Sequence, residues 1–462
     1  MKQYCYLGID IGTSNTKAIL MDKDGNIVEA THYSTPLLEE DGVTFFEIRK
    51  LELIVDKIIM DYSQRFVLIG VSFATVGETV IPVKSGSSMG NPLVWYDKAT
   101  LKIAKRFWPA LKDELDYSVV GSSFDYTFSY FKILWLKESA HINIDEVEFF
   151  LPLSSYFIYR YTRKAYYDFS QASRTLLFNQ KTGSWNNEFL KAHQLAGKFP
   201  EILPMGTFVG CDTKGIPYSL GGHDHLVSAR CLKEFTQGKT LVFDSIGTSE
   251  SVLVLPCPNL CDSNDSNIVT GTSFAAKSYY YLKGIHFSGL LLEKLSILMG
   301  YKDSESCCNS LNSEILCNPS SLKKPFKIAV NEKGEIKLGK FSFETNQQTL
   351  LYSLYLYLSL LSKQLILDIS DKQKGPESKI VLAGASTENK LYLDFRATIL
   401  GKPLYIPTFK ELGCTGAIFN AAQGNNDSEF IENFVTRQTF NVVFPCPQKY
   451  PFFLTDAKEI GQ

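Results

Sequence analysis

Hydrophobic and polar residues alternate on both sides of a small-residue turn at the start of the chain. The run YCYLGIDIG, residues 4–12, alternates between apolar and other residues. The segment DKDG, residues 22–25, supplies a turn in which Gly25 can take a positive φ, and NIVEATHYS, residues 26–34, is the returning strand. Alternation with a period of two is typical of β-strands, and Asp-Gly turns commonly join the strands of a hairpin. The pattern therefore predicts that a strand pair opens the chain.

Segments with helical spacing then alternate with strand-like runs. Residues 50–65 have the apolar spacing of a helix, and VLIGVSFAT and TVIPV, separated by Gly77 and Glu78, have the character of strands. Residues 100–220 are richer in helical and aromatic segments, such as FSYFKILWLKES and SSYFIYRYT, and are interpreted as an insertion that covers the sheet. This alternation predicts an α/β fold.

A second strand pair is predicted in TLVFDSIGTSESVLVL, residues 240–255, and its DSIGTS segment repeats the IDIGTS of the first pair. Internal similarity at about half the chain length indicates two related halves. The 462 residues also exceed the usual size of one domain. We therefore expect two domains, residues 1–235 and 236–462, with a hinged boundary near residues 233–239. In the second domain, KIVLAGASTENK predicts a strand, a turn and a helix start, and ELGCTGAIFNAAQG predicts a helix.

Composition and charge narrow the class of protein. The chain is 45% hydrophobic and 21% charged with a net charge of −2, which is typical of a globular protein. Basic and acidic residues are mixed along it, so a nucleic-acid partner is not expected. The ten cysteines, with Cys257 and Cys261 or Cys307 and Cys308 as the closest pairs, do not repeat as a four-ligand zinc pattern, so free thiols are expected.

The apolar segments do not predict a membrane protein. The start, MKQYCYLGID, has no apolar core of signal-peptide length. The run LLYSLYLYLSLLS from Leu350 is interrupted by tyrosines and serines and is interpreted as a buried or amphipathic helix. We therefore expect a cytoplasmic protein without a membrane partner.

The two GTS turns have the chemistry of a phosphate site. Gly12 and Gly247 would let backbone N–H groups approach an anion closely. Hydroxyl groups and one cation add further donors, from Thr13, Ser14, Lys17, Thr248 and Ser249. Asp10 has the opposite sign and fits a Mg²⁺ ligand that acts through water. Each turn could also be only a tight hairpin, but two copies in matching strands favour phosphate binding.

An ordered set of segments resembles a known family. In chain order they are LGIDIGTSNTKAILMD, GVSFATVGETVIPV, PLVWYDKAT, FKILWLKE, GGHDHLVSA, DSIGTSESV, VLAGASTENKLYLDFRATILGKPL and LGCTGAIFNAA. Together they are similar to the FGGY carbohydrate kinases of the actin-like ATPase superfamily. The resemblance implies an α/β fold of two ribonuclease-H-like domains with an interdomain cleft for ATP and Mg²⁺. It also implies phosphorylation of a sugar hydroxyl by ATP, with the sugar bound mainly by the N-terminal domain.

Asp224, in GGHDH, matches the position of the family's catalytic aspartate. A carboxylate within reach of an alcohol can orient it and accept its proton. From the residues alone, the HDH segment also fits a turn capped by Asp224, or a metal site that uses His223 and His225. The resemblance favours Asp224 as the base, leaves His225 open, and suggests that His223 contacts sugar hydroxyls.

Glu78, Trp95 and Asp97 match segments that line the substrate pocket in family members. Carboxylates accept hydrogen bonds from sugar hydroxyls, and an indole packs on the apolar face of a sugar. The alternatives are core packing for Trp95 and a solvated side chain for Glu78.

The adenosine end of the nucleotide site corresponds to Gly384 and Ala385 by the same resemblance. Gly413 and Gly416 fit either a nucleotide-lining helix or close packing of that helix on a sheet. The chain departs from the family at Ala99, where an arginine is usual, in LSSYFIYR, which lacks the usual aspartate, and in AGAS, which lacks a second adjacent glycine.

The predicted function is ATP-dependent phosphorylation of a sugar. A ketopentose such as xylulose is the first candidate, because the motif order and the length are similar to xylulokinase-like members. Gluconate, other ketoses and polyols stay open as substrates. So does a nucleotide-binding regulatory protein whose catalysis has decayed, and so does a homodimer, since dimers are common in the family.

Overall fold

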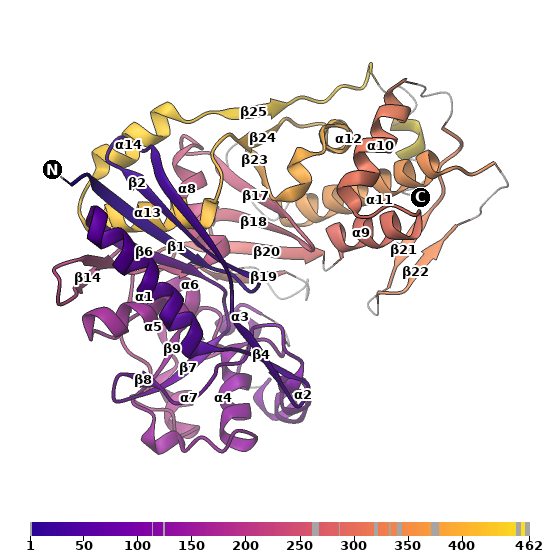
Figure 1. Ribbon diagram of the computed structural model, residues 1–462. Coiled ribbons are helices and arrows are strands. Elements are labelled where there is room, and N and C mark those ends of the chain that lie inside the picture. The colour runs from indigo at the N-terminus through magenta and orange to yellow at the C-terminus, as the bar shows by residue number, and fades with distance from the viewer. Residues whose placement is uncertain are drawn as a thin grey trace. The chain divides into compact units, whose positions relative to one another are not determined.

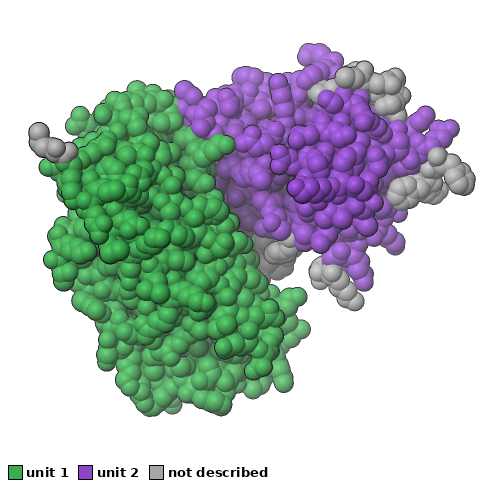
Figure 2. All heavy atoms as spheres, in the orientation of Figure 1, with its two compact units in different colours: residues 1–237, 256–281, 409–438 green, residues 238–255, 282–408, 439–462 purple. Residues whose placement is uncertain are grey.

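The computed structural model describes residues 2–112, 114–122, 125–260, 268–285, 287–317, 322–331, 334–339, 344–370, 378–449 and 454–457. The chain forms two compact units, which Figure 2 shows in different colours. Unit 1 comprises residues 1–237, 256–281 and 409–438, and unit 2 comprises residues 238–255, 282–408 and 439–462.

The central sheet of unit 1 is mixed, with the strand order β14-β15-β6-β1-β2-β3 (Figure 1). β1 pairs with β2 in antiparallel and with β6 in parallel orientation. The strands are β1 (Tyr4–Ile11), β2 (Asn15–Asp22), β3 (Ile27–Ser34), β6 (Val67–Thr75), β14 (Phe208–Cys211) and β15 (Pro217–Ser219). The strand pair predicted at the start is thus a meander of three strands. It reverses at Gly12–Ser14 as well as at the predicted turn, where Gly25 has a φ of 81°.

The two faces of β1 contact different helices. Leu7 and Ile9 are fully buried in the same hydrophobic cluster as Leu51 of α1 (Ile48–Arg65). Residues two apart share a face of a strand, so Gly8 and Asp10 lie on the opposite face, against α13 (Leu412–Gly424). Asp10 is therefore held beside α13, and the hydrophobic core lies behind it.

The predicted insertion is helical and aromatic, as expected. Its helices are α2 (Ala99–Leu111), α3 (Tyr117–Val120), α4 (Ser129–Glu138), α5 (Leu153–Thr162), α6 (Phe169–Ala172) and α7 (Asn187–Ala192). α5 packs against β6 and so covers part of the sheet. α8 (Asp224–Glu234) and α14 (Ser428–Arg437) also belong to unit 1.

Shorter elements connect these parts of unit 1. The strands are β4 (Leu37–Glu40), β5 (Val43–Phe46), β7 (Val80–Lys84), β8 (Ser87–Ser88), β9 (Phe149–Pro152), β10 (Tyr167–Asp168), β11 (Phe178–Asn179), β12 (Ser184–Trp185), β13 (Ile202–Leu203), β16 (Gly222–His223) and β19 (Val269–Thr272). A 3₁₀ turn spans Ile144–Glu146. β16 pairs with β6, which places its end next to the end of that central strand.

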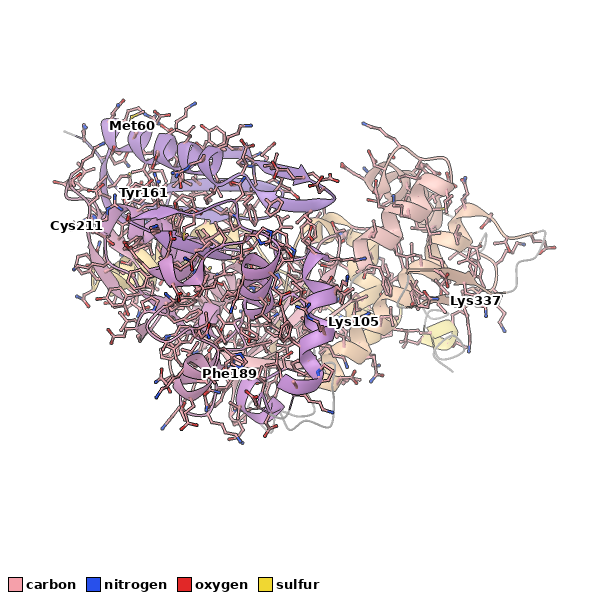
Figure 3. All side chains as sticks on the ribbon, turned by 90° about the horizontal axis from the view of Figure 1, so that it is seen from below. Met60, Lys105, Tyr161, Phe189, Cys211 and Lys337 are labelled. Atoms are coloured by element: carbon pink, nitrogen blue, oxygen red, sulfur yellow. The ribbon has the colours of Figure 1, made fainter. Side chains whose placement is uncertain are left out.

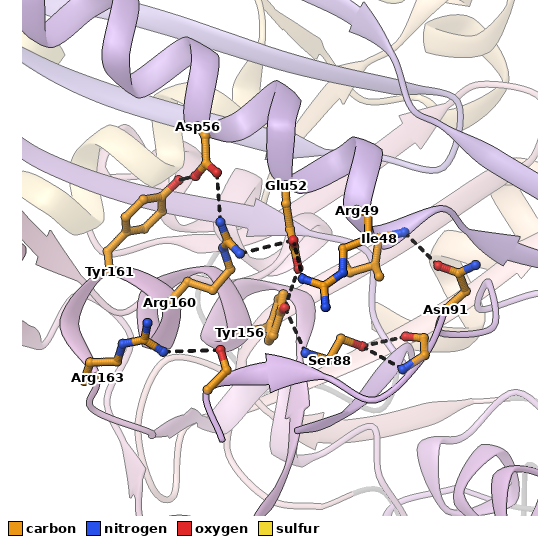
Figure 4. Close-up of polar contacts among 12 residues, drawn as sticks. Ile48, Arg49, Glu52, Asp56, Ser88, Asn91, Tyr156, Arg160, Tyr161 and Arg163 are labelled. Atoms are coloured by element: carbon orange, nitrogen blue, oxygen red, sulfur yellow. Dashed lines mark hydrogen bonds and ion pairs between the residues drawn. The ribbon is translucent and has the colours of Figure 1, made fainter. Parts of the chain in front are cut away.

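A polar network joins α1 to α5 (Figure 4). Arg160 of α5 lies 2.8 Å from an oxygen of Asp56 and 3.2 Å from one of Glu52, both on α1. Tyr156 donates a hydrogen bond of 2.5 Å to Glu52. The insertion is thereby fastened to the helix that backs the sheet.

The main sheet of unit 2 contains the second predicted hairpin. Its strands follow the order β20-β18-β17-β23-β24-β25. They are β17 (Thr240–Ile246), β18 (Glu250–Cys257), β20 (Tyr279–Ile285), β23 (Ser378–Ala383), β24 (Leu404–Pro407) and β25 (Phe440–Val443). β17 pairs with β18 in antiparallel and with β23 in parallel orientation. The β17–β18 pair confirms the prediction for residues 240–255.

The helices of unit 2 are α9 (Ser288–Leu298), α10 (Ser304–Cys317), α11 (Gln347–Ser370) and α12 (Lys390–Leu400). Unit 2 also contains a small hairpin of β21 (Ile328–Val330) and β22 (Ile336–Leu338) and a 3₁₀ turn at Ala385–Glu388. The strand, turn and helix predicted from KIVLAGASTENK are β23, this 3₁₀ turn and α12.

α11 is a buried helix, as its tyrosines and serines predict. Residues 347–369 are long and apolar enough to span a membrane by length and composition alone, although the sequence had suggested a shorter segment. However, 61% of the most apolar window is buried within the protein, and Leu351, Tyr355 and Leu358 belong to the hydrophobic cluster of unit 2. The apolar character of α11 is thus used in the core.

The compact units divide the chain differently from the predicted domains 1–235 and 236–462. The first break, after residue 237, falls within the expected boundary region. Residues 256–281 and 409–438, however, pack with unit 1. α13 belongs to unit 1 because it lies directly on β1. The absence of a side chain at Gly8 permits this approach, since a Cβ there would lie 2.0 Å from the carbonyl oxygen of Cys414.

The cysteines with described side chains are free thiols, as predicted: Cys5, Cys211, Cys231, Cys257, Cys307, Cys308, Cys414 and Cys446. Cys211 is exposed and lies at the edge of the molecule in Figure 3, as does Met60 of α1. Cys261 lies outside the described residues.

Candidate active site

The first GTS turn, Gly12–Ser14, connects β1 and β2 and is called the first turn below. Gly12 donates a backbone hydrogen bond of 2.9 Å to Asn15, and its carbonyl accepts one of 2.9 Å from the hydroxyl of Thr35. Thr13 and Ser14 remain at least partly accessible. The turn is thus held through Gly12, while its hydroxyl residues face outwards.

Asp10 stands beside this turn in an acidic environment. Burial and the neighbouring carboxylate of Asp224 raise the pKa of Asp10 to about 7, although Lys17 opposes the effect. α13 closes over the carboxylate, because a Cβ on Gly413 would lie 2.3 Å from Asp10 Oδ2. A Cβ on Gly416 would likewise lie 2.0 Å from the carbonyl oxygen of Val227, so α13 also packs closely on α8. The structure thus shows close packing at both glycines, on β1 at Gly413 and on α8 at Gly416.

Lys17 lies opposite Asp10 on β2. Its Nζ forms an ion pair of 2.8 Å with Glu411, which precedes α13. Burial lowers the pKa of Lys17, but Glu411 outweighs this and raises it, so the side chain stays charged. Sequence reasoning missed Glu411, whose φ of 55° places it in a left-handed conformation that the sequence does not signal.

Asp224 is the first residue of α8, and its carboxylate is partly exposed. Its Oδ1 accepts a hydrogen bond of 2.6 Å from the backbone N–H of His225 and lies 3.7 Å from Nε2 of His223. Burial lowers the pKa of His223 to about 3 although Asp224 favours the charged form. His223 is therefore neutral at physiological pH and does not neutralise the Asp224 carboxylate.

A buried chain of hydrogen bonds holds His223 from behind. The backbone N–H of His223 donates to the hydroxyl of Ser170 at 2.9 Å, and this hydroxyl donates to Asp168. Asp168 also accepts from the backbone N–H groups of Ser170 and Gln171 as the cap of α6. The Asp-x-Ser spacing in DFSQAS is the sequence signal that could have revealed this cap.

The imidazole of His223 lies against Gly77. A Cβ at position 77 would be 2.4 Å from Cδ2 of the ring, so the absence of a side chain there makes room for His223. Glu78 follows directly, with a φ of 57°.

Glu78 is buried and forms an ion pair with Arg174, which is also buried. Burial alone lowers the pKa of Arg174, but Glu78 outweighs this effect and keeps the guanidinium charged. Glu78 is thus not the solvated side chain that the sequence left open. Arg174 was missed, because no local pattern connects two residues 96 positions apart.

A buried cation, Lys132, lies close to Glu78. Burial lowers its pKa to about 8, although Glu78 opposes this. Its Nζ donates to the backbone carbonyl of Trp95 at 3.2 Å and to that of Thr127. Lys132 therefore supports the backbone at the position of the predicted sugar-stacking residue.

Trp95 is 38% exposed, so it is not a core residue. Its indole N–H donates a hydrogen bond of 3.0 Å to the hydroxyl of Thr13, which connects it to the first turn. Asp97 is buried, and its two oxygens accept from the backbone N–H groups of Thr44 and Ala99 at 2.8 and 2.7 Å. These bonds give Asp97 a structural role next to Trp95.

Unit 2 brings the other predicted residues together. The second turn, Gly247–Ser249, connects β17 and β18 and is exposed. β23 lies beside β17, and Gly384 follows its end with a φ of 111°. A Cβ on Gly384 would lie 2.2 Å from the carbonyl oxygen of Ile246, so the 3₁₀ turn that Gly384 precedes begins directly against the end of β17, next to the second turn.

Among the described residues, no group of three or more His, Cys, Asp and Glu side chains could hold a metal ion. His223 and His225 therefore form no such cluster. The acidic surroundings that raise the pKa of Asp10 fit a cation that is held by one protein carboxylate and otherwise by water and phosphate oxygens. Asp10 would hold Mg²⁺ in this way.

Comparison with known proteins identifies the class. Residues 5–229 match the N-terminal domain of the FGGY family of carbohydrate kinases. A glycerol kinase of Janthinobacterium sp. (strain Marseille) is 23% identical over 448 residues, which cover 90% of this chain and 89% of that protein.

Solved structures have the same fold. A gluconate kinase from Lactobacillus acidophilus has a TM-score of 0.85 at 16% identity and covers 100% of this chain and 97% of its own. Plasmodium falciparum glycerol kinase with ADP has a TM-score of 0.84 at 17% identity, covering 99% and 97%. A xylulose kinase from Lactobacillus acidophilus has a TM-score of 0.82 at 16% identity, covering 99% and 97%.

The chain thus contains an FGGY carbohydrate-kinase N-terminal domain, which confirms the resemblance seen in its motifs. Its fold is the two-domain actin-like α/β fold of these kinases, as predicted. The class of enzyme is a phosphotransferase with an alcohol group as acceptor.

Proposed function

We propose that this chain transfers the γ-phosphoryl group of ATP to a hydroxyl of a small neutral sugar or polyol, with Asp224 as the general base. The observation that carries the proposal is the setting of Asp224. Its carboxylate is accessible, lies beside a neutral His223 and is close enough to Asp10 to raise the pKa of that residue. A carboxylate in this setting can accept a proton from an alcohol.

In the proposed reaction, Asp224 orients the acceptor hydroxyl and takes its proton. The hydroxyl oxygen forms a bond to the γ-phosphorus while the bond from this phosphorus to the bridging oxygen breaks, and ADP leaves with that oxygen. Mg²⁺, when bound beside Asp10, neutralises charge on the phosphate groups. The Asp168–Ser170 chain holds the backbone of His223 and so keeps Asp224 in place.

A phosphate-binding role is proposed for each turn within its own unit. Backbone and hydroxyl donors of Gly12, Thr13 and Ser14, and of Gly247, Thr248 and Ser249, serve the phosphate groups. Lys17 adds a positive charge, and Gly384 and Ala385 serve the adenosine end. The contact of Gly384 with Ile246, the residue before the second turn, supports this arrangement within unit 2.

The acceptor site is proposed to include Glu78, Trp95, Asp97 and His223. Charge favours a neutral acceptor: Glu78 neutralises Arg174, and Lys132 donates to two backbone carbonyls. A sugar acid would need a cation that is not already engaged in this way. A ketopentose such as xylulose is the first candidate.

Glycerol is the second candidate acceptor. It is favoured by the match to the Janthinobacterium glycerol kinase along 90% of this chain. For either acceptor we propose a cytoplasmic enzyme whose partners are the acceptor and ATP.

The test is a coupled ADP-release assay with Mg²⁺ and ATP against xylulose, other ketoses, glycerol, other polyols and gluconate. We expect one neutral acceptor to raise turnover well above the background, and Asp224→Asn to abolish the increase without loss of ATP binding. Full turnover in Asp224→Asn would remove Asp224 from the role of base. A chain that binds ATP but phosphorylates nothing would support a regulatory function, and one that does not bind ATP would overturn the phosphate-binding role of the turns.

A further inference from the structure

Three ionisable side chains meet inside unit 2, directly behind the second turn. Asp244 of β17, Glu250 of β18 and Arg396 of α12 have fully buried side chains. One guanidinium nitrogen of Arg396 contacts Asp244 and also lies 2.6 Å from Glu250 Oε1. We call these three residues the ion cluster.

The ion cluster brackets the second turn on both strands. Asp244 lies three residues before Gly247, and Glu250 follows Ser249 directly. The turn is exposed, whereas both carboxylates are buried. A single guanidinium therefore sets the ends of both strands from which the exposed turn projects.

Glu250 extends the cluster to two further helices. Ser288 at the start of α9 donates a hydrogen bond of 3.0 Å to Oε2, and Ser362 of α11 donates one of 2.6 Å to Oε1. Hydrogen bonds to a charged acceptor are short and directional. Glu250 is therefore fixed relative to α9, α11 and α12 at the same time.

The start of α9 also contacts the second turn itself. The backbone N–H of Leu290 donates to the carbonyl of Thr248 at 2.9 Å. A Cβ on Gly289 would lie 2.1 Å from the carbonyl oxygen of Gly247, so helix and turn are in direct contact. Through Ser288, Glu250 thus aligns the surface against which the turn rests.

Stability alone does not explain these charges. Buried ion clusters can often be replaced by apolar residues at no cost in stability. The first hairpin has such a solution, with the fully buried Ile9 at the position that corresponds to Asp244. What ions add is a fixed geometry, because their hydrogen bonds have one arrangement whereas apolar side chains can repack.

We propose that Arg396 is a positioning residue for the phosphate groups of ATP. It holds Asp244 and Glu250 and thereby fixes the backbone of the second turn in the conformation that binds phosphate. This inference rests on the phosphate-binding role proposed for that turn.

The test replaces the ion cluster by apolar side chains in the triple variant Asp244→Ile, Glu250→Leu, Arg396→Met. We expect a folded protein with a melting temperature close to that of the wild type. Its Kd for Mg²⁺–ATP, measured by calorimetry without acceptor, should rise about tenfold, the equivalent of one charge-assisted hydrogen bond. The KM for the acceptor should stay unchanged.

A second variant, Arg396→Lys, keeps the charge and loses the fork that serves two carboxylates. It decides the question by the same Kd if the triple variant does not fold. The matched control is Lys283→Met, which removes a partly buried ion pair of 2.7 Å with Asp368 in the same unit. The control should bind ATP like the wild type.

The outcomes separate the two proposals. An unchanged Kd for ATP in the folded triple variant, or in Arg396→Lys, would overturn the positioning role while the proposed function stands. An equal rise in Kd in Lys283→Met would also overturn it, because any loss of a buried ion pair would then have the same effect. A wild-type protein that binds no ATP would overturn both proposals.

Discussion

The hairpins β1–β2 and β17–β18 share the sequence Ile-Gly-Thr-Ser but differ in what lies behind their turns. In the first, Ile9 faces the hydrophobic core, and the next residue, Asp10, faces Asp224 on the other side of the strand. In the second, the corresponding residues are Asp244, which faces Arg396 inside the protein, and Ser245. The first hairpin thus has its carboxylate on the face of the strand opposite the hydrophobic core, whereas the second has it at the position that faces the interior.

This difference assigns different tasks to two similar turns. The first hairpin places the carboxylate of Asp10 near that of Asp224 and obtains its stability from apolar contacts. The second exposes a neutral turn and is held by buried ions. Two hairpins can therefore share a turn sequence and still differ in the role of the carboxylate that precedes the turn. Asp10 is proposed to take part in the reaction, and Asp244 is proposed to hold the turn in place.

The largest effect should come from the acidic residues beside the first hairpin. Asp224→Asn should lower turnover by about 10²- to 10⁴-fold, because the amide cannot accept the hydroxyl proton. The thermal melting curve should not move to lower temperature. Asp61→Asn on α1 is the control, and a comparable loss of turnover in that variant would show that the effect is not specific to the site.

Removing Arg396 should produce the largest loss of stability in the second hairpin. Above about pH 7, where Asp244 is ionised, Arg396→Met leaves two buried carboxylates without their cation, which should cost about 3–5 kcal/mol of unfolding free energy. Chemical denaturation measures this loss. Adding Asp244→Asn and Glu250→Gln should restore part of it, and the absence of any recovery would contradict the charge explanation.

The pH dependence of stability should reveal the ion cluster. Burial raises the pKa of Asp244 to about 7 and outweighs the opposing effect of Arg396, so Asp244 joins the ion cluster as a carboxylate only above about pH 7. The folded state then keeps a proton that the unfolded state releases near pH 3.9, so stability from this group is lost as the pH rises from about 4 to 7.

Asp244→Asn cannot titrate and should therefore lose less stability than the wild type over that range. The difference between the two proteins should change by up to about 1.4 kcal/mol per pH unit. Urea denaturation at several pH values measures it. A difference that changes in the opposite direction would mean that Arg396 dominates and that the pKa of Asp244 is lowered.

The smallest effect should come from the apolar support of the first hairpin. Ile9→Val removes one buried methylene group and should cost about 0.5–1.5 kcal/mol without affecting turnover. The same denaturation assay measures this change. A reduction of turnover in Ile9→Val would show that the core behind the first turn also controls the position of Asp10, and the contrast between the hairpins would weaken.

The local elements were predictable because their signals are local. Strand-like runs identified β6 and β17–β18, and the run ELGCTGAIFNAAQG identified the helix α13. The sequence predicted one strand pair that reverses at the DKDG turn, whereas the chain already reverses at Gly12–Ser14, between β1 and β2. The earlier reversal was missed because β1 and β2 differ little in hydrophobic pattern and the DKDG turn gives the stronger signal. Membership of residues 409–438 in unit 1 was not predictable, since it depends on contacts of Gly8 and Gly413 with segments some 400 positions away along the chain.

The residues of the candidate site also divide into those found from local motifs and those defined by contacts between distant parts of the chain. Asp10, Asp224 and the two turns were named from motifs, and their proposed roles await experiment. Arg174 and Arg396 were missed, because their acidic partners lie 96 and about 150 positions away. Only the folded chain brings such charges together, and a single sequence carries no sign of that pairing.

Gly77 has an evolutionary consequence. The imidazole of His223 occupies the space that a side chain at position 77 would need. Position 77 can therefore not change freely: a lineage that acquires a larger residue at 77 must already have a smaller one at 223. Substitutions at these two positions should be inherited as a pair, and the order of the two steps should be constrained, with the change at 223 coming before the change at 77.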